Sequence, residues 1–260
     1  MAENRMVHFV GAGPGAEDLI TLRGAKLLEE ADCIIYAGSL VNPKLLLRAK
    51  ESCVIYNSAT MTLEEVLDVM VEQYALGHRT VRLHTGDPSM YGAIREQMDA
   101  LEEKGIPYDV TPGVSSVFGA AAALNAEFTL PGVSQTLILT RMAGRTPVPE
   151  AEALEKLAAS GASMAIFLSA GLLKEVEEAL CKGAVTKDSP AAIVYKATWP
   201  EEKTLYCTVG TLAMAAEREG VKSTALIFAG DFLTATPERS KLYDPEFTTG
   251  FRTGKGNENA

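Results

Sequence analysis

The sequence has few of the residues that metal centres and disulfide frameworks require. Its 260 residues include only four cysteines and three histidines, and no Cys-x-x-Cys pair occurs. These residues are Cys33, Cys53, Cys181, Cys207, His8, His78 and His84. Their spacing matches no metal-ligand pattern, so we expect no protein-held metal. We interpret the scattered cysteines as reduced core residues of a cytoplasmic protein.

Long apolar runs and excess positive charge are also missing. The longest nearly apolar stretch, residues 164–173, is far shorter than the roughly 18 to 20 residues that cross a bilayer. The first five residues, MAENR, do not begin a secretory signal. With 24 Lys and Arg against 34 Asp and Glu, the net charge is −10, which disfavours a nucleic-acid partner. We therefore expect no membrane association, and any anionic ligand must be held by local arginines or lysines.

What the sequence does contain is enough apolar material for a full core, because 47% of its residues are hydrophobic. Apolar β-branched runs alternate with amphipathic segments, which predicts an α/β fold with mostly parallel sheets. The predicted strands are 6–10, 33–36, 80–83, 108–110, 136–140, 164–168, 191–195, 204–209 and 225–229. The predicted helices are 19–30, 62–75, 93–103, 117–124, 150–159, 172–180 and 211–219.

The alternation is interrupted once, at residues 125–134, where Pro131 and Gly132 stand together. We place a domain boundary there, which gives an N-terminal α/β domain over 1–125 and a C-terminal α/β domain over 126–233. A short link at residues 199–202 suggests a hairpin and hence some antiparallel pairing in the second domain. Residues 234–260 show no periodicity and are predicted to form a peripheral or disordered tail.

A glycine-rich loop follows the first predicted strand. Residues 11–16 read GAGPGA and match the G-x-G-x-x-A fingerprint of dinucleotide-binding folds. Three details disfavour a nicotinamide cofactor: the next helix begins several residues later, Pro14 removes an amide donor, and no acidic residue ends the second strand. Either the glycines let the loop backbone approach another kind of ligand closely, or the loop is a plain tight turn.

Two further loops follow strands of the same predicted sheet. In residues 84–92, Asp87 either caps a helix that begins near Ser89 or accepts hydrogen bonds from a ribose or a cationic group. Residues 111–116, TPGVSS, bring hydroxyls to the next strand end. Because three such loops meet at one sheet edge, a nucleotide-like ligand is expected there.

The second half supplies cationic candidates. Arg141 and Arg145 lie in a loop that Pro and Gly keep from being helical, and they are either solvated charges or a clamp for carboxylates. Lys196 stands near Trp199, the only tryptophan, which is either part of a lid or a packing residue.

Together these loops resemble the tetrapyrrole (corrin/porphyrin) methyltransferase family, whose members use S-adenosylmethionine. The resemblance spans residues 7–233 and rests on five blocks in the family's order. They are VGAGPG (10–15) with LIT (19–21), DCIIY (32–36), GDP (86–88), PGVSS (112–116) and TALI (224–227). It implies the tetrapyrrole methylase fold of two α/β domains with a ligand cleft between them, and a homodimer.

Within the family, residues 84–94, 140–150 and 194–200 resemble the branch that methylates C11 of precorrin-4 or cobalt-precorrin-4 in cobalamin biosynthesis. That reaction gives precorrin-5 or cobalt-precorrin-5, and the residues leave open whether cobalt is already bound. Alternatives are the uroporphyrinogen-III C2/C7, precorrin C17 and C20 methyltransferases, or a diphthine-synthase-like protein methyltransferase. A nicotinamide oxidoreductase and a non-catalytic ligand-binding domain are the remaining classes.

Carried over position by position, the resemblance implies the ligand contacts. Those to S-adenosylmethionine, which leaves as S-adenosylhomocysteine, are Pro14, Gly86, Asp87, Met90, Ser115, Ser116, Leu168, Ala197 and Thr224. Those to the polycarboxylate tetrapyrrole are Tyr36, Ser39, Arg141, Arg145 and Lys196. Asp87 is in addition the catalytic candidate, with an orienting or electrostatic role. Leu168 stands where several relatives have methionine.

Overall fold

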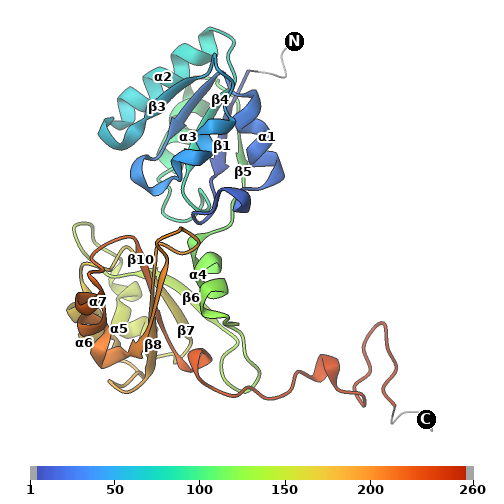
Figure 1. Cartoon of the computed structure of the whole chain (residues 1–260), viewed down its shortest axis with the longest axis vertical. Helices are drawn as coiled ribbons and strands as arrows, with labels where there is room; N and C mark the ends of the chain where they lie inside the picture. The colour runs from blue at the N-terminus through green and yellow to red at the C-terminus, as the bar shows by residue number, and fades with distance from the viewer. Residues whose placement is uncertain (1–4, 256–260) are drawn as a thin grey trace. The chain divides into compact units, whose positions relative to one another are not determined.

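The computed structural model describes residues 5–255, apart from the side chain of Ser39, and the chain forms two compact units (Figure 1). The first unit holds the described residues up to Ala123 together with Lys196–Lys203. The second holds Leu124–Tyr195 and the described residues from Thr204 onward. The chain therefore passes from one unit to the other three times, and the inclusion of Lys196–Lys203 in the first unit is not foreseen by the sequence.

The first unit is built on a five-stranded sheet with the order β3-β2-β4-β1-β5, and neighbouring strands in it run parallel. Its strands are β1 (Val7–Gly11), β2 (Cys33–Tyr36), β3 (Val54–Asn57), β4 (Thr80–His84) and β5 (Tyr108–Thr111). Its helices are α1 (Leu22–Glu30), α2 (Leu63–Ala75), α3 (Arg95–Glu103) and α4 (Ser116–Leu124). Because β1 lies between β4 and β5 and runs parallel to both, the three strands end side by side at one edge of the sheet.

Both faces of the first sheet are buried under helices, as parallel sheets require. On one face Val10, Ile34 and Leu83 pack with Leu28 of α1. On the other, Phe9 and Ile35 pack with Met70 of α2 and with residues of α3. Side chains alternate between the faces along each strand, which explains why these strands read as continuous apolar runs.

The second unit contains a mixed five-stranded sheet with the order β6-β7-β10-β8-β9. Its strands are β6 (Leu137–Arg141), β7 (Ser163–Phe167), β8 (Pro190–Tyr195), β9 (Lys203–Thr208) and β10 (Ala225–Ala229). β6 runs parallel to β7, whereas β10 is antiparallel to both β7 and β8. The predicted fold class, two α/β sheets of mostly parallel and mixed strands, is confirmed.

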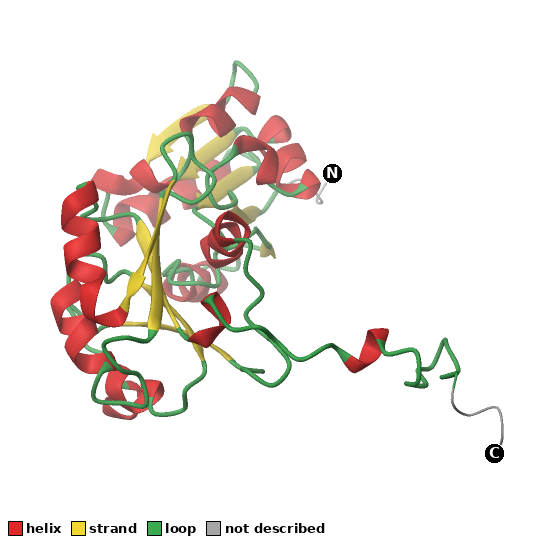
Figure 2. Cartoon of the chain, turned by 60° about the horizontal axis from the view of Figure 1, so that its bottom comes forward, coloured by secondary structure: helices red, strands yellow, loops and turns green. Residues whose placement is uncertain are grey.

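Helices α5 (Leu154–Ala158), α6 (Leu173–Leu180) and α7 (Leu212–Glu219) cover one face of the second sheet. Val176, Leu180 and Leu212 bury their side chains against Ile166 and Ile227 of the strands. Figure 2 shows the strands of each sheet in yellow with red helices along them. On the opposite face Phe128, Phe228 and Phe232 form an aromatic cluster with ring centroids 5.2–6.5 Å apart.

Short 3-10 turns fill several of the connections. They are Glu17–Leu19, Gly38–Leu40, Pro43–Arg48, Ser58–Thr60, Glu150–Glu152, Val209–Thr211, Asp231–Leu233 and Lys241–Tyr243. The last lies in residues 234–255, which are otherwise loop with a single isolated bridge between Thr249 and Arg252. Over the described range, no helix combines the length and apolar character needed to cross a membrane.

Candidate functional site

Three loops interlock at the carboxyl edge of the first sheet. Residues 11–16 follow β1, residues 85–94 follow β4 and residues 112–115 follow β5. Gly13 and Gly86 form an antiparallel bridge, in which the Gly86 amide donates to the Gly13 carbonyl at 2.8 Å. The Ala12 amide donates to the His84 carbonyl at 2.7 Å. The three predicted loops therefore do converge on one edge, as open α/β sheets require for a ligand site.

Glycine is needed in these loops because the backbones touch. A Cβ atom on Gly11 would lie 2.5 Å from Gly113 Cα, and one on Gly113 would lie 2.1 Å from the Gly86 oxygen. Gly13 adopts φ +81°. The helix after the loop, α1, begins only at Leu22 with Thr21 as its N-cap, so its amides do not point at the glycines. Close packing between the loops thus explains why glycines stand at these positions, and a dinucleotide-binding fingerprint is not needed to explain them.

Asp87 ties two of the loops together. Its Oδ2 accepts a hydrogen bond from the Gly113 amide at 2.9 Å, and its Oδ1 accepts from the Ser89 amide at 2.9 Å and from the Ser89 hydroxyl. Burial alone raises the pKa of this carboxyl group, but the hydrogen bonds from Ser89 and Gly113 outweigh it, so the pKa is lowered. Asp87 is therefore a carboxylate at neutral pH. The alternative that it caps a helix near Ser89 is wrong, because α3 begins only at Arg95.

The remaining predicted cofactor residues of the first unit lie around this centre. The Met90 amide donates to the Asp87 carbonyl at 3.1 Å. Ser115 is buried and Ser116 opens α4, and the Cβ position of Gly86 is 3.3 Å from the Ser116 nitrogen. The Pro14 carbonyl accepts a hydrogen bond from Trp199, which stands two residues after the buried Ala197. Seven of the nine predicted cofactor residues thus belong to the first unit.

Two predicted tetrapyrrole contacts also follow a strand of the first sheet. Tyr36 ends β2, and its carbonyl accepts a hydrogen bond from the Ser58 hydroxyl at 3.1 Å. Ser39 lies in the 3-10 turn Gly38–Leu40, and its side chain falls outside the described residues. Lys196 is half-buried, with Nζ 3.7 Å from Glu201 and 5.5 Å from the centre of the Trp199 ring.

Leu168 and Thr224 belong to the second unit. Leu168 directly follows β7 and Thr224 directly precedes β10. Because β7 and β10 are antiparallel neighbours, these two residues lie at the same end of adjacent strands. Leu168 is 67% exposed, which is unusual for a leucine at the end of a buried strand.

Arg141 and Arg145 differ in what their side chains do. The Arg141 guanidinium donates to the carbonyls of Thr146 at 3.1 Å and Pro147 at 2.6 Å, so it organises its own loop. The Met142 amide donates to the Ser169 hydroxyl at 2.9 Å, which fixes the start of the loop beside the end of β7. Arg145 is exposed at the loop's tip. Of the two, Arg145 presents its charge to solvent.

Unfavourable backbone conformations occur at several of the predicted site residues. The non-glycine residues with positive φ in the described chain are Tyr91, Ala93, Asn125, Leu168, Lys196, Thr198 and Thr224. Leu168, Lys196 and Thr224 are themselves predicted site residues, while Tyr91 follows Met90 and Thr198 follows Ala197. Such strained conformations gather at ligand sites, because the surrounding structure must hold them there.

A buried polar group under the first sheet's edge was not singled out from the sequence. Arg82 is 7% exposed; its Nε donates to Gln97 Oε1 at 3.1 Å and its guanidinium to the Ile35 carbonyl at 3.2 Å. Gln97 in turn donates to the Ala93 carbonyl at 2.9 Å, which holds the strained loop after Met90. Burial lowers the pKa of Arg82 to about 10. An arginine inside an otherwise apolar strand is the signal that could have found it.

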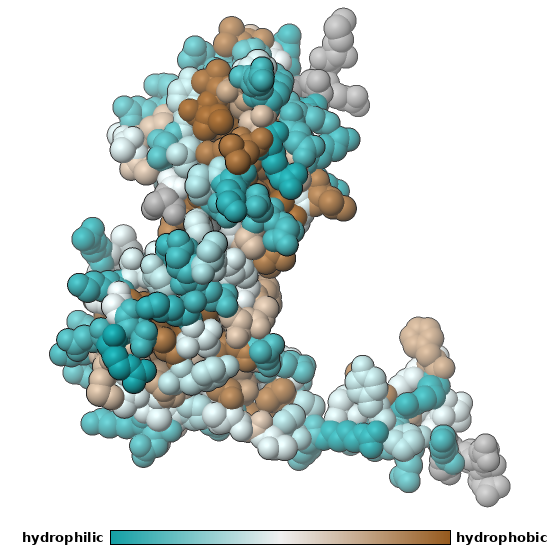
Figure 3. Space-filling view, in the orientation of Figure 1, coloured by the Kyte–Doolittle hydropathy of each residue, from teal (hydrophilic) through white to brown (hydrophobic). Residues whose placement is uncertain are grey.

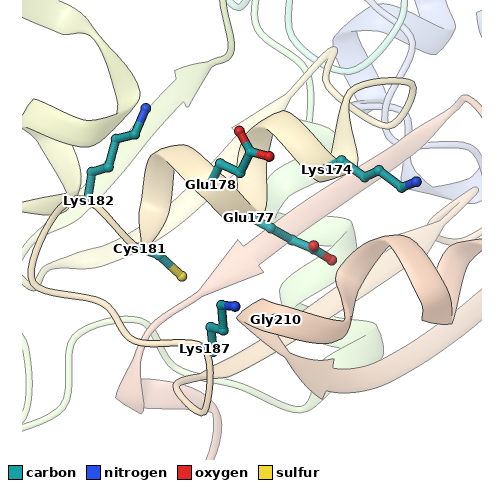
Figure 4. A pocket seen from close by; sticks show the side chains of 7 residues that line it. All are labelled: Lys174, Glu177, Glu178, Cys181, Lys182, Lys187 and Gly210. Carbon is teal, nitrogen blue, oxygen red and sulfur yellow. The ribbon is translucent and has the colours of Figure 1, made fainter.

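An open hollow of about 550 Å³ lies elsewhere, on the second unit between α6 and the start of α7 (Figure 4). It is lined by Lys174, Glu177, Glu178, Cys181, Lys182, Lys187 and Gly210. Glu177 Oε1 already accepts a hydrogen bond from the Ala213 amide at 2.7 Å. The hollow contains none of the predicted site residues. Within residues 5–255, no group of three or more His, Cys, Asp or Glu side chains is arranged to hold a metal ion.

Two α/β units, with a three-loop edge that interlocks through glycines and Asp87, define the class of protein. The chain belongs to the tetrapyrrole (corrin/porphyrin) methylases, whose family model matches residues 6–213. It is 51% identical over 253 residues to the cobalt-precorrin-4 C(11)-methyltransferase of Methanocaldococcus jannaschii, covering 97% of this chain and 98% of that protein. It is 44% identical to the precorrin-4 C(11)-methyltransferase of a Sinorhizobium species, covering 96% and 99%.

Solved structures agree with this family. The X-ray structure of a cobalt precorrin-4 methyltransferase, a cobalamin biosynthetic enzyme, is 45% identical and has a TM-score of 0.88, covering 90% of this chain and 98% of that one. The uroporphyrin-III C-methyltransferase of Thermus thermophilus complexed with S-adenosylhomocysteine is 25% identical and has a TM-score of 0.71, covering 90% and 96%. The resemblance predicted from the five sequence blocks is confirmed.

Proposed function

We propose that this protein is an S-adenosylmethionine-dependent methyltransferase that methylates C11 of cobalt-precorrin-4 or precorrin-4 in cobalamin biosynthesis. The observation that carries the proposal is the 51% identity to a cobalt-precorrin-4 C(11)-methyltransferase over 97% of the chain. Relatives named precorrin-4 C(11)-methyltransferase, with no mention of cobalt, are 40–44% identical to this chain. The cobalt-containing substrate is therefore the better supported of the two.

S-adenosylmethionine supplies a methyl group on a sulfonium, an electrophile that an electron-rich tetrapyrrole carbon attacks directly. The protein's task is to hold the two reactants in line and to exclude water. Rigid backbone suits this task. The cofactor contacts that we propose are Pro14, Gly86, Asp87, Met90, Ser115, Ser116, Leu168, Ala197 and Thr224. Three of these, Gly86, Leu168 and Thr224, have positive φ, so their amides and carbonyls point in directions that ordinary strands do not offer.

Asp87 has an orienting role in this proposal. Its carboxylate accepts hydrogen bonds from Gly113 and Ser89, and a carboxylate has lone pairs left for one more donor, such as a ribose hydroxyl or the cofactor's ammonium group. Its negative charge also favours a positively charged ligand beside it. We propose that Asp87 fixes the cofactor by both effects.

The tetrapyrrole carries several carboxylates, and we propose Tyr36, Ser39, Arg141, Arg145 and Lys196 as the residues that face it. Arg145 is the best candidate for a direct ion pair, because Arg141 is engaged with loop carbonyls. Arg145→Ala is expected to raise the KM for the tetrapyrrole about 10-fold at an unchanged melting temperature. Arg218→Ala, which removes an exposed charge from α7, serves as the control. Equal KM values for the two variants would remove Arg145 from the site.

Isothermal titration of the purified protein with S-adenosylhomocysteine, and separately with NAD, tests the proposal first. We expect micromolar binding of S-adenosylhomocysteine and none of NAD. Incubation with ¹³C-methyl-labelled S-adenosylmethionine and the tetrapyrrole then fixes the position of the new methyl group by NMR. A methyl at C11 supports the proposal, whereas one at C2, C7, C17 or C20 replaces it with a sister activity.

We further propose that the protein is a cytoplasmic homodimer, as its resemblance to the family implies. Light scattering coupled to size-exclusion chromatography is expected to give twice the chain mass of 27.7 kDa. A mass of one chain over the micromolar range would overturn this part of the proposal without touching the activity.

A further inference from the structure

The segment Lys196–Lys203, here called the strap, connects β8 to β9 and yet belongs to the first unit. Its residues lie against the glycine-rich loop that follows β1. The Trp199 indole Nε1 donates to the Pro14 carbonyl at 3.2 Å, and the Thr198 hydroxyl accepts from the Ala16 amide at 2.9 Å. The strap therefore meets the loop through two side chains that are adjacent in sequence.

The strap completes the hydrogen bonding of the loop. The amide and carbonyl of Gly13 are bonded to Gly86, and the Gly15 carbonyl accepts from the Asn42 side chain at 2.8 Å. The Pro14 carbonyl and the Ala16 amide are hydrogen-bonded to the strap. Each residue from Gly13 to Ala16 therefore has at least one backbone group held by a hydrogen bond, and the strap supplies two of these bonds.

Steric fit adds to the hydrogen bonds. A Cβ atom on Gly15 would lie 2.1 Å from Cδ1 of Trp199, so Gly15 is required because the indole lies directly on the backbone there. A Cβ atom on Gly119 of α4 would lie 2.7 Å from Pro14 Cβ and 3.2 Å from Thr198 Cγ2. Two glycines far apart in the sequence thus make room for the same contact.

The strap is itself held in an unfavourable conformation. Thr198 has φ +68°, which is rare for a β-branched residue, and Lys196 has φ +46°. The Thr198 amide donates to Glu202 Oε2 at 2.5 Å, and Lys196 Nζ lies 3.7 Å from Glu201. Such backbone conformations are unfavourable for residues other than glycine, and this one persists because the contacts with the loop compensate for it.

We infer that Trp199 and Thr198 are positioning residues of the cofactor site, acting through Pro14 and Ala197. Trp199 fixes the carbonyl of Pro14, and the conformation of Thr198 fixes the peptide of its neighbour Ala197. This inference rests on the proposed function, because Pro14 and Ala197 are cofactor contacts only if S-adenosylmethionine binds there. Displacement of such contacts by about 1 Å is enough to weaken binding and catalysis strongly.

Matched substitutions test the inference. Thr198→Val keeps the shape of the side chain but removes the acceptor of the Ala16 amide, whereas Thr198→Ser keeps that acceptor. Trp199→Phe keeps an aromatic ring but loses the donor to Pro14. We expect Thr198→Val and Trp199→Phe to raise the Kd for S-adenosylhomocysteine, and the KM for S-adenosylmethionine, about 5- to 10-fold. Thr198→Ser is expected to stay within about 2-fold of the wild type.

Two controls distinguish an effect on the cofactor site from a general loss of stability. Tyr206→Phe removes the hydrogen bond of 3.1 Å to the Leu124 carbonyl, a similar loss in the second unit, and is expected to leave both constants unchanged. Gly15→Ala pushes the indole away, so the double variant with Trp199→Phe should weaken binding by less than the product of the two single effects. Melting temperatures of all variants are measured in parallel.

Trp199 also reports directly, because it is the only tryptophan in the chain. Titration of the wild type with S-adenosylhomocysteine is expected to change the tryptophan fluorescence with the same Kd that calorimetry gives. Calorimetric binding with unaltered fluorescence would place the cofactor away from the strap and overturn the inference.

The outcomes distinguish this inference from the proposed function. If the wild type does not bind S-adenosylhomocysteine, the proposed function fails and the inference falls with it. If the wild type binds, but Thr198→Val and Trp199→Phe bind equally well, only the inference is overturned. Should Trp199→Phe fail to fold, the Thr198→Val and Thr198→Ser pair decides alone.

Discussion

Asp87, His84 and Arg82 show how much of the site depends on single residues that face inward. Asp87 connects the loops after β4 and β5, and His84 ends β4 directly beneath them. His84 is 4% exposed, and its Nε2 has no hydrogen-bond partner among the described residues. The sequence predicted Asp87 as a site residue, but its bond to the Gly113 amide depends on a contact 26 positions away that no local pattern contains.

Asp87→Asn is expected to lower the free energy of unfolding at pH 7 by about 1.5–3 kcal/mol, because hydrogen bonds to a charged group are lost. The pKa of Asp87 is lowered in the folded protein, so its contribution is complete above the unfolded pKa near 3.9 and disappears as the pH falls through the folded pKa. Urea unfolding of both proteins at pH 7 and at pH 3 measures the difference.

Asp188→Asn, at an exposed carboxylate, is the control for Asp87. A difference between Asp87→Asn and the wild type that is as large at pH 3 as at pH 7 would contradict the electrostatic explanation. Unchanged activity together with unchanged cofactor affinity in Asp87→Asn would remove its proposed orienting role.

His84 is expected to make the protein sensitive to mild acid. Burial, with a smaller contribution from Arg82, lowers the pKa of His84 to about 3, whereas an unfolded histidine titrates near pH 6.5. As the pH falls below about 6.5 the unfolded chain binds the proton and the folded protein does not. Stability is therefore lost between about pH 6.5 and pH 3, at up to about 1.4 kcal/mol per pH unit.

The substitution His84→Gln should make the free energy of unfolding fall less steeply between pH 6.5 and pH 4, as measured by urea titration at each pH. His78→Gln is the matched control. His78 follows the end of α2, and its ring is hydrogen-bonded to Gln73 of that helix. Parallel curves for wild type and His84→Gln would show that folding does not lower the pKa of His84.

Among elements, those with strong periodicity or clear end signals could be predicted closely. The helix predicted over 62–75 is observed as α2 with its capping box, in which Glu65 Oε2 accepts from the Thr62 amide at 2.7 Å. Strand β3 was missed, because its four residues pair only with β2 at the sheet edge and show no alternation. Its existence depends on lateral hydrogen bonds that a sequence pattern does not display.

Predicted helix starts were less accurate where the backbone leaves the helical region. The helix predicted from residue 93 begins at Arg95, because Ala93 has φ +49°. The one predicted over 19–30 is a 3-10 turn followed by α1, since Ile20 is extended. That predicted over 150–159 is divided by Ala153, which is extended. Helix propensity along the sequence does not locate such breaks, because it is a weak guide to single backbone angles.

The capping box of α2 offers a test at this scale. Thr62→Ala removes the side chain that accepts from the Glu65 amide and is expected to lower the free energy of unfolding by about 1 kcal/mol. Thr62→Ser keeps the hydroxyl and should cost only a few tenths of that amount. Urea unfolding midpoints provide the comparison, and equal midpoints for Thr62→Ala and the wild type would show that α2 does not depend on its cap.

On the scale of the whole molecule, apolar surface remains exposed at several elements. Figure 3 shows brown, apolar atoms gathered over part of the first unit. Exposed apolar side chains of that unit include Leu22 at 92%, Leu47 at 83%, Val54 at 45% and Ile55 at 42%. Val54 and Ile55 belong to β3, which is the edge strand of the first sheet, so this edge presents apolar side chains to solvent.

The end of the second unit can be tested by truncation. Phe232 packs in the aromatic cluster, and the Glu238 amide donates to the Pro131 carbonyl at 3.1 Å, whereas residues 240–255 form mostly local contacts. Truncation after Arg239 is expected to change the melting temperature by less than about 2 °C. Truncation after Gly230 also removes Phe232 and should lower it by roughly 10 °C. A large decrease in melting temperature after truncation at Arg239 would show that the removed residues contribute to stability.

The strap has a consequence for how the protein is made. Trp199 leaves the ribosome about 75 residues after Ala123, which at 5–20 residues per second is a delay of roughly 4–15 s. During that interval the nascent first sheet has all of its strands, but its glycine-rich loop lacks the bonds to Pro14 and Ala16. The amino-terminal half therefore matures only when translation of most of the second sheet is complete. A ribosome that stalls between these two points leaves an unfinished glycine-rich loop exposed to proteases and chaperones.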